Sequence, residues 1–255
     1  MGSERWWDGS GWASYTRRAT AGDDARRIPL RALWWALLGI AVGEIAGSVL
    51  ALGVGSATGT PVTAAAPELA GELGLWAGMI GAVLVVSRNY GSRSLREDFG
   101  LALRPVDLAV GLGVAVIGLV VVQVVGAVFA GTRFAGSNTQ ILSGERGHPA
   151  GVVVVTLIVA VGAPVFEELF FRGLIRTALA SKLGGQGAVW GQALLFGLAH
   201  LGEAHGLGNV SVVLSLVLLG AVLGYTAMLT RRLGGGMVAH GLFNLTAALV
   251  VFAVH

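Results

Sequence analysis

The chain alternates between long apolar runs and short stretches that hold most of its charged residues. After a polar arm over residues 1–31, we recognise seven apolar segments. They lie at 33–55, 70–87, 106–131, 150–171, 187–201, 209–230 and 236–254. A helix that spans a bilayer needs about 20 predominantly apolar residues, so the fifth segment is short. The pattern predicts an all-α, polytopic membrane helix bundle of about seven transmembrane helices.

The positions of Lys and Arg predict how this bundle is oriented. Of the 17 basic residues, 15 lie in the arm or in the stretches 88–104, 172–182 and 231–232. These regions share one side of the membrane if the arm is cytoplasmic, and cytoplasmic loops carry an excess of Lys and Arg. We therefore expect a cytoplasmic basic arm over 1–31, a bundle over 32–255, the N-terminus inside and the C-terminus outside.

Composition supports the membrane assignment and narrows the chemistry. Hydrophobic residues make up 55% of the chain and charged residues 12%, with a mean hydropathy of +0.76. Soluble domains carry about 25% charged residues. The chain has no Cys, which excludes disulfides, thiolate catalysis and Cys-ligated metals. The basic residues act as a topology signal, so no nucleic-acid partner is expected. The short tail and single compact unit suggest a bacterial plasma membrane.

Two adjacent glutamates, Glu167 and Glu168, lie in the fourth apolar segment. Charged residues inside a bilayer cost about 2.5–3.5 kcal/mol on insertion scales and commonly mark functional sites. Residues four apart share a helix face, so Glu168 can pair with Arg172 while Glu167 points elsewhere. Glu167 is then suited to accept a proton. The alternative is a Glu–Arg pair at the cytoplasmic end of a helix, with Glu167 solvated at the interface.

Three more polar side chains lie in later apolar segments. His200 follows Phe196 by four residues, and His240 and Asn244 share a face of the last segment. Imidazole and carboxamide groups can stabilise a developing oxyanion, although both also serve as hydrogen bonds between membrane helices. At about 1.5 Å per residue, His200 lies roughly 20 Å into its helix and His240 roughly 6 Å into its own. They can meet only if the fifth helix tilts or begins deeper, or if a cytoplasmic funnel cuts into the bundle.

Together these residues resemble the three motifs of the CPBP family, the CAAX proteases and bacteriocin-processing enzymes also called Abi, which includes the type II prenyl-protein endopeptidases. The motifs read Glu167-Glu-x-x-x-Arg172, Phe196-x-x-x-His200 and His240-x-x-x-Asn244. The resemblance covers about 150–250, where the protease motif core is expected. It implies an integral-membrane endopeptidase acting on a membrane-associated peptide or protein, with Glu168 and Arg172 holding the site together.

The same resemblance implies the other roles. Glu167 would be the base, His200 would orient and activate water, and His240 with Asn244 would stabilise the tetrahedral intermediate. The family is often labelled metalloprotease, and Glu167, His200 and His240 could bind zinc with one open position. The chain has no His-Glu-x-x-His motif, and Asn is a poor zinc ligand. We therefore favour metal-independent water activation without a cofactor, and zinc remains the alternative.

Two other functions remain open at this point. The fold could serve as a non-catalytic membrane scaffold or immunity protein, or as a proton-coupled transporter with Glu167, His200 and Glu44 as its relay. Glu44 itself could pair with another helix or line a cavity. The notable polar positions that remain are an interfacial elbow at 88–101, Gln123 and Gln192 as hydrogen bonders between helices, and Glu203 and His205 in an exposed loop.

Overall fold

The computed structural model describes residues 28–253 except for nine positions. These are Asn138, Gln140, Ile141, Ser143, Gly144, Arg146, Gly147, Glu203 and His205. Most of the expected basic arm and the loop residues Glu203 and His205 therefore lie outside the described residues. The basic residue Arg146 does too.

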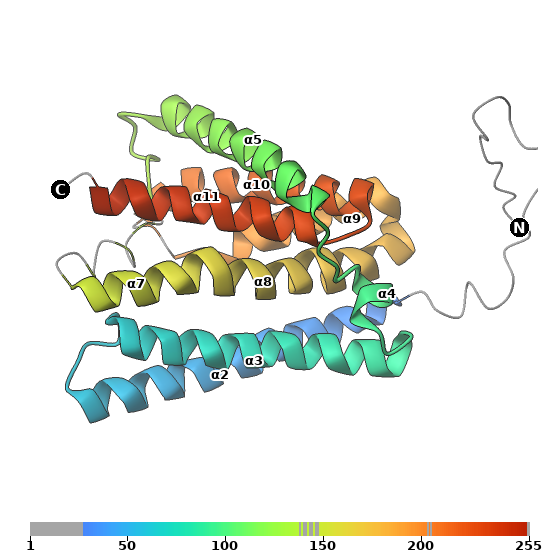
Figure 1. Ribbon diagram of the computed structural model, residues 1–255, viewed down its shortest axis with the longest axis horizontal. Helices are drawn as coiled ribbons and strands as arrows, with labels where there is room; N and C mark the ends of the chain where they lie inside the picture. Colours follow the sequence, from blue (N-terminus) through green and yellow to red (C-terminus); the bar gives the residue numbers. More distant parts are fainter. Residues whose placement is uncertain are drawn as a thin grey trace, which may run out of the picture.

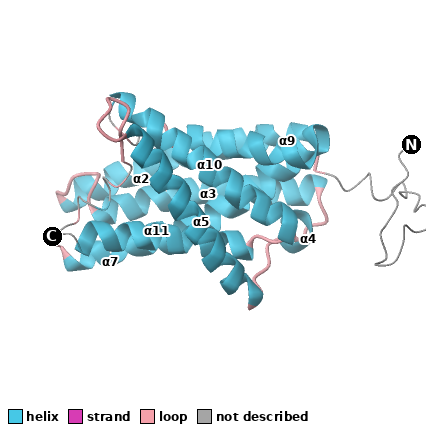
Figure 2. Cartoon of the chain, turned by 90° about the horizontal axis from the view of Figure 1, so that it is seen from above, coloured by secondary structure: helices cyan, strands magenta, loops and turns pink. Residues whose placement is uncertain are grey.

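Helices account for all regular structure in the described residues, so the all-α prediction is confirmed (Figures 1 and 2). In chain order they are η1 (Leu30–Ala32), α2 (Leu33–Thr58), α3 (Ala65–Tyr90), α4 (Leu95–Phe99), α5 (Val106–Phe129), α7 (Pro149–Leu157), η2 (Ile158–Gly162), α8 (Ala163–Glu167), η3 (Glu168–Ile175), α9 (Arg176–Ala199), η4 (Gly206–Gly208), α10 (Asn209–Thr230) and α11 (Gly234–Ala253). Within the described ranges, six continuous helical stretches are long and apolar enough to cross a membrane.

One of these stretches, Pro149–Ala199, contains two of the expected spans. It is 51 residues long, and its backbone leaves the helical region at Gly184, where φ is 67° and ψ is 179°. A Cβ placed on Gly191 would lie 3.0 Å from Leu179 Cδ1, a contact that a straight helix could not bring about between residues twelve apart. The chain therefore doubles back at Gly184. The reversal separates the fourth and fifth apolar segments, and the helix after it is short, as expected.

Helices α2 and α3 form a closely packed hairpin on one side of the bundle (Figure 1). A Cβ on Gly43 would lie 2.8 Å from the Leu75 carbonyl oxygen, so the two backbones approach more closely than any larger residue would allow. Such small-residue contacts drive helix association where lipid gives no hydrophobic force. The hairpin is fixed to the rest of the bundle by Trp76, whose ring stacks on Phe166 with centroids 4.7 Å apart.

The expected elbow begins with the last residues of α3, continues through the short helix α4, and packs against the start of α11. Leu233 N donates to Gly100 O over 2.9 Å, and Gly234 N donates to Ala102 O over 3.1 Å. Asp107 accepts from Arg232 Nη2 over 2.8 Å. As a result α11 begins short of the end of the bundle where the chain turns back into α9 (Figure 1). His200 and His240 do meet, since both imidazoles lie against the Phe196 ring, with centroids 4.7 and 6.0 Å away.

Helix α2 begins at one end of the bundle and α11 ends at the opposite end (Figure 1), as an odd number of crossings requires. Which end is cytoplasmic stays a prediction. Gln192 does bridge helices, donating from Nε2 to Gly220 O on α10 over 2.8 Å. The same expectation is wrong for Gln123, whose side chain is exposed on α5.

Candidate active site

The helix that carries the two glutamates is wound as π-helix on both sides of α8. The segments η2 and η3 are π-helical, a geometry in which each carbonyl accepts from the N–H five residues later. For Val159 that residue is Pro164, which has no N–H. The Val159 carbonyl instead accepts from Asn244 Nδ2 over 2.7 Å. Proline in the motif helix thus creates the acceptor that attaches α11 to it.

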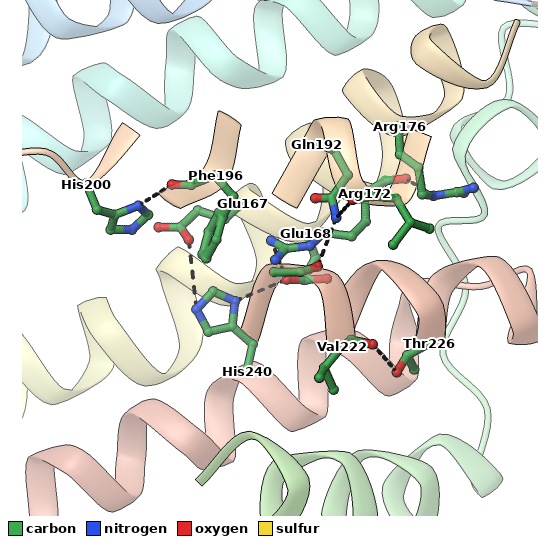
Figure 3. Close-up of polar contacts among 12 residues, drawn as sticks. Glu167, Glu168, Arg172, Arg176, Gln192, Phe196, His200, Val222, Thr226 and His240 are labelled. Carbon is green, nitrogen blue, oxygen red and sulfur yellow. Dashed lines mark hydrogen bonds and ion pairs between the residues drawn. The ribbon is translucent and has the colours of Figure 1, made fainter. Parts of the chain in front are cut away.

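Glu168 and Arg172 form the ion pair expected from their spacing. Both side chains are fully buried, and Arg172 Nη1 lies 3.0 Å from Glu168 Oε1. This contact is an ion pair without a hydrogen bond, since no N–H of the Arg172 guanidinium has a hydrogen-bond partner. The same carboxylate oxygen lies 3.1 Å from His240 Nδ1, and since a carboxylate only accepts, Nδ1 donates. Glu168 therefore holds the imidazole of His240 in one orientation (Figure 3).

The ring of Phe196 packs at the centre of the site. The Arg172 guanidinium carbon lies 4.1 Å from its centroid, a cation–π contact. The imidazoles of His200 and His240 lie with ring centroids 4.7 and 6.0 Å from the same ring. Phe196 is itself almost completely buried. One aromatic side chain from α9 therefore fixes the positions of the buried cation and of both histidines.

Glu167 lies on the other side of His240. Its Oε2 is 3.8 Å from His240 Nε2, and its side chain is 19% exposed (Figure 3). Because Nδ1 of His240 already donates to Glu168, the neutral ring would present a lone pair at Nε2. A protonated ring would instead present an N–H at Nε2 toward Glu167. The imidazole of His240 thus lies between two carboxylates that differ in burial: Glu168 is enclosed, whereas Glu167 reaches a cavity.

His200 caps α9 and shares that cavity with Glu167. Its Nδ1 lies 2.7 Å from the Phe196 carbonyl oxygen. A carbonyl can only accept, so Nδ1 carries a hydrogen and Nε2 has the lone pair in the neutral ring. This backbone contact selects the tautomer that can accept a proton from water at Nε2.

The cavity has a volume of about 690 Å³ and lies between the α2–α3 hairpin and the motif helices. Glu167, Phe171 and His200 line one wall. The opposite wall comes from α2, α3 and the turn that joins them. It includes Glu44, which was expected either to pair with another helix or to line a cavity, and which does line the cavity. Water and a polar ligand can therefore be accommodated next to the two motif residues that face open space.

Zinc stays an alternative, although the described residues do not present a preformed group of three His, Asp or Glu side chains that could hold a metal ion. One nitrogen of each imidazole is held in place, by Glu168 in the case of His240 and by Phe196 O in the case of His200. Such contacts also orient imidazoles that bind metals, so they do not decide between the two readings.

The structure brings together five of the six expected site residues in one connected cluster: Glu167, Glu168, Arg172, His200 and His240. Asn244 is connected through the backbone of η2. Sequence reasoning missed the central role of Phe196, although its position four before His200 was visible. It also missed the acidic cavity wall, for which Glu44 in the middle of an apolar segment was the available signal.

One comparison with known proteins gives a match. Residues 149–246 match the family model described as Rce1-like, type II CAAX prenyl endopeptidase Rce1-like. No curated protein matches the chain. No solved structure matches it either. The matched segment runs from the start of α7 into α11 and contains every residue of the three motifs. This membrane protein therefore contains, over residues 149–246, a segment that matches the Rce1-like type II CAAX prenyl endopeptidase family.

Proposed function

We propose that the protein is an intramembrane endopeptidase that hydrolyses a peptide bond of a membrane-associated peptide or protein, using water activated by glutamate and histidine. The observation that carries this proposal is the pair of positions taken by Glu167 and His200. Both line one cavity, while Glu167 is also 3.8 Å from an imidazole that a second carboxylate holds in place.

In the first step, a water molecule between Glu167 and His200 loses a proton to the Glu167 carboxylate as its oxygen attacks the carbonyl carbon of the substrate. The neutral His200 ring accepts a hydrogen bond at Nε2 and orients the water. The C–O bond forms, and the carbonyl electron pair moves onto oxygen. A positioned general base contributes typically about 10²–10⁴-fold to such a step.

The oxyanion then needs a hydrogen-bond donor. In its protonated form, His240 has an N–H at Nε2 beside Glu167, where it can stabilise this charge. The buried Glu168 supports that protonated ring through Nδ1, as the orienting carboxylate of a catalytic triad does. When the C–N bond breaks, the proton taken up by Glu167 passes to the leaving nitrogen, which restores the resting site. Glu168 and Arg172 act as positioning residues.

Asn244 was expected to assist at the oxyanion, and this role stays a prediction. One hydrogen of its amide goes to the Val159 carbonyl, which leaves the second hydrogen of Nδ2 for another acceptor. The structural and catalytic roles can be separated. If Asn244 is only structural, Asn244→Asp should lower the stability and the turnover together at every pH. If Asn244 also donates to the oxyanion, turnover should be lost in protein that remains folded.

The deciding experiment compares the membrane peptidome of a deletion strain complemented with the native protein, with Glu167→Gln or with Glu97→Gln. Glu97 is exposed on α4 and serves as the matched control. A protease predicts that the same uncleaved peptides accumulate with the deletion and with Glu167→Gln, but not with Glu97→Gln. A scaffold predicts full complementation by Glu167→Gln, which would refute the proposal.

One observation also favours a proton-coupled transporter. The three residues of the relay considered above, Glu44, Glu167 and His200, line the same cavity. A transporter needs a proton pathway that is accessible alternately from both sides of the bilayer. Flux of protons or solute into liposomes that contain the purified protein, abolished by Glu44→Gln, would support this second function. A peptidase predicts no such flux.

A further inference from the structure

The cavity extends from the turn between α2 and α3, where Val62 and Thr63 line it, to Glu167 and His200. Glu44 of α2 also lines it. This residue lies near the centre of the 26-residue helix α2, at the depth where an isolated carboxylate in lipid is most costly. Because Glu44 borders the cavity, its charge has a polar space to face. The space can therefore hold water or a polar group beside the middle of α2.

The charge of the lining is of one sign. Among the described residues that line the cavity are four carboxylates, from Glu44, Glu68, Glu72 and Glu167, and no Lys or Arg. Low-dielectric walls of one charge focus the electrostatic potential inside a cleft. A cation entering this cavity would be stabilised along its whole length, and an anion would be repelled.

The rest of the lining is apolar and includes Ile40, Leu75, Met79 and Phe171. A volume of about 690 Å³ lies within the range of about 300–1,000 Å³ that encloses a ligand of drug size, equivalent to a few residues of extended peptide. The chemistry therefore suits a short peptide segment in which apolar side chains flank a basic one.

Three of the four carboxylates come from the α2–α3 hairpin, outside the matched segment 149–246. The chemical step and the recognition of the substrate would then reside on opposite walls of one cavity. Trp76 of α3, stacked on Phe166 directly before Glu167, fixes the distance between the two walls. Changes in the hairpin can thus alter which peptide binds without altering the residues that activate water.

From this geometry we infer that the α2–α3 hairpin is the specificity wall of the protease, and that Glu44 and Glu68 select a substrate with a Lys or Arg side chain close to the scissile bond. The inference rests on the proposed peptidase function. It is tested first by a measurement that needs no cleavage.

The chain has no Cys, so single cysteines can be labelled without background. Ser48 lines the cavity one helical turn after Glu44. In Ser48→Cys protein in detergent, a quaternary-ammonium methanethiosulfonate should react at least about fivefold faster than a sulfonate one, after correction for their rates with free thiol. Adding Glu44→Gln should reduce this preference about fivefold, whereas adding Glu97→Gln should leave it unchanged. Equal rates for the two reagents, or no labelling by either, would refute an acidic, water-filled cavity.

A second measurement tests recognition. In Ser48→Cys/Glu167→Gln protein, an apolar peptide with one central Lys should protect the cysteine from a neutral thiol reagent at concentrations at least about tenfold lower than the same peptide with Gln. Adding Glu44→Gln should remove the difference. Equal protection by both peptides would overturn the specificity role even if Glu167 proves catalytic. Conversely, if the Lys peptide protects the cysteine selectively but the native protein never cleaves a peptide, the binding inference stands and the peptidase proposal is refuted. Thermal unfolding of each variant checks that it is folded.

Discussion

Removing the charge of Glu168 should destabilise the protein strongly, because it breaks a buried ion pair. Glu168 and Arg172 are both fully buried and 3.0 Å apart. Loss of one partner from such a pair typically costs about 3–5 kcal/mol, since the other charge stays buried without compensation. Glu168→Gln therefore leaves the Arg172 guanidinium with the face of Phe196 and the charge of Glu167, without its buried ion-pair partner.

The size of the effect can be converted into a melting temperature. For a chain of this size, 1 kcal/mol corresponds to a shift of roughly 2–4 °C, so Glu168→Gln should lower the apparent Tm by about 6–20 °C. The assay is thermal unfolding in detergent, followed by tryptophan fluorescence at a fixed scan rate. Glu97→Gln removes an exposed carboxylate and should shift the Tm by less than about 2 °C.

A double-mutant cycle makes the reasoning refutable. Arg172→Met removes the cation and keeps much of its apolar volume. If the loss comes from an uncompensated charge, Glu168→Gln/Arg172→Met should be clearly more stable than the sum of the two single changes predicts. Additive losses, or a Glu168→Gln protein that melts with the native one, would show that this pair does not hold the site together.

Three further predictions follow from particular contacts. Asn244→Ala should cost about 1–3 kcal/mol, because it leaves the Val159 carbonyl unpaired; Thr246→Ala, which loses only a bond to its own helix, is the control in the same unfolding assay, and equal effects would contradict the account. Gly184→Ala should cost about 1–3 kcal/mol of stability, because Gly184 has a positive φ. The control is Gly81→Ala, where a Cβ meets nothing within 4 Å and no such loss is expected. A stable Gly184→Ala protein would argue against the sharp reversal. Finally, Thr63→Cys should react with an impermeant thiol reagent added to intact cells, and Glu97→Cys only after permeabilisation; the opposite result would reverse the predicted orientation.

The positions of the helices were largely predictable from the sequence. Each apolar segment corresponds to a helix or to one half of the stretch that reverses at Gly184, because length and hydropathy are local properties of the chain. The pairing of Glu168 with Arg172 was equally local, since spacing along one helical turn decides it. The motif residues could likewise be named in advance, because few polar groups lie inside apolar segments and each is conspicuous.

What the sequence left open depends on the relative depth of separate segments. The estimate that His200 and His240 would lie at different depths assumed helices that start at a common level. In the folded protein, the elbow at Gly100–Ala102 binds the backbone before α11 and sets that helix inward. No periodicity within α9 or α11 contains this information, because it arises from hydrogen bonds between segments more than 100 residues apart.

By itself, then, the sequence determined that the chain is a bundle of apolar helices with a small set of ionisable residues within it, since the cost of charge in lipid acts on each residue separately. Only the tertiary structure decided that His240 lies between two carboxylates of unequal burial, that Phe196 supports both imidazoles, and that the α2–α3 hairpin supplies an acidic wall opposite Glu167. These features depend on how closely helices pack and where each one begins, and such quantities are fixed by contacts between distant parts of the chain.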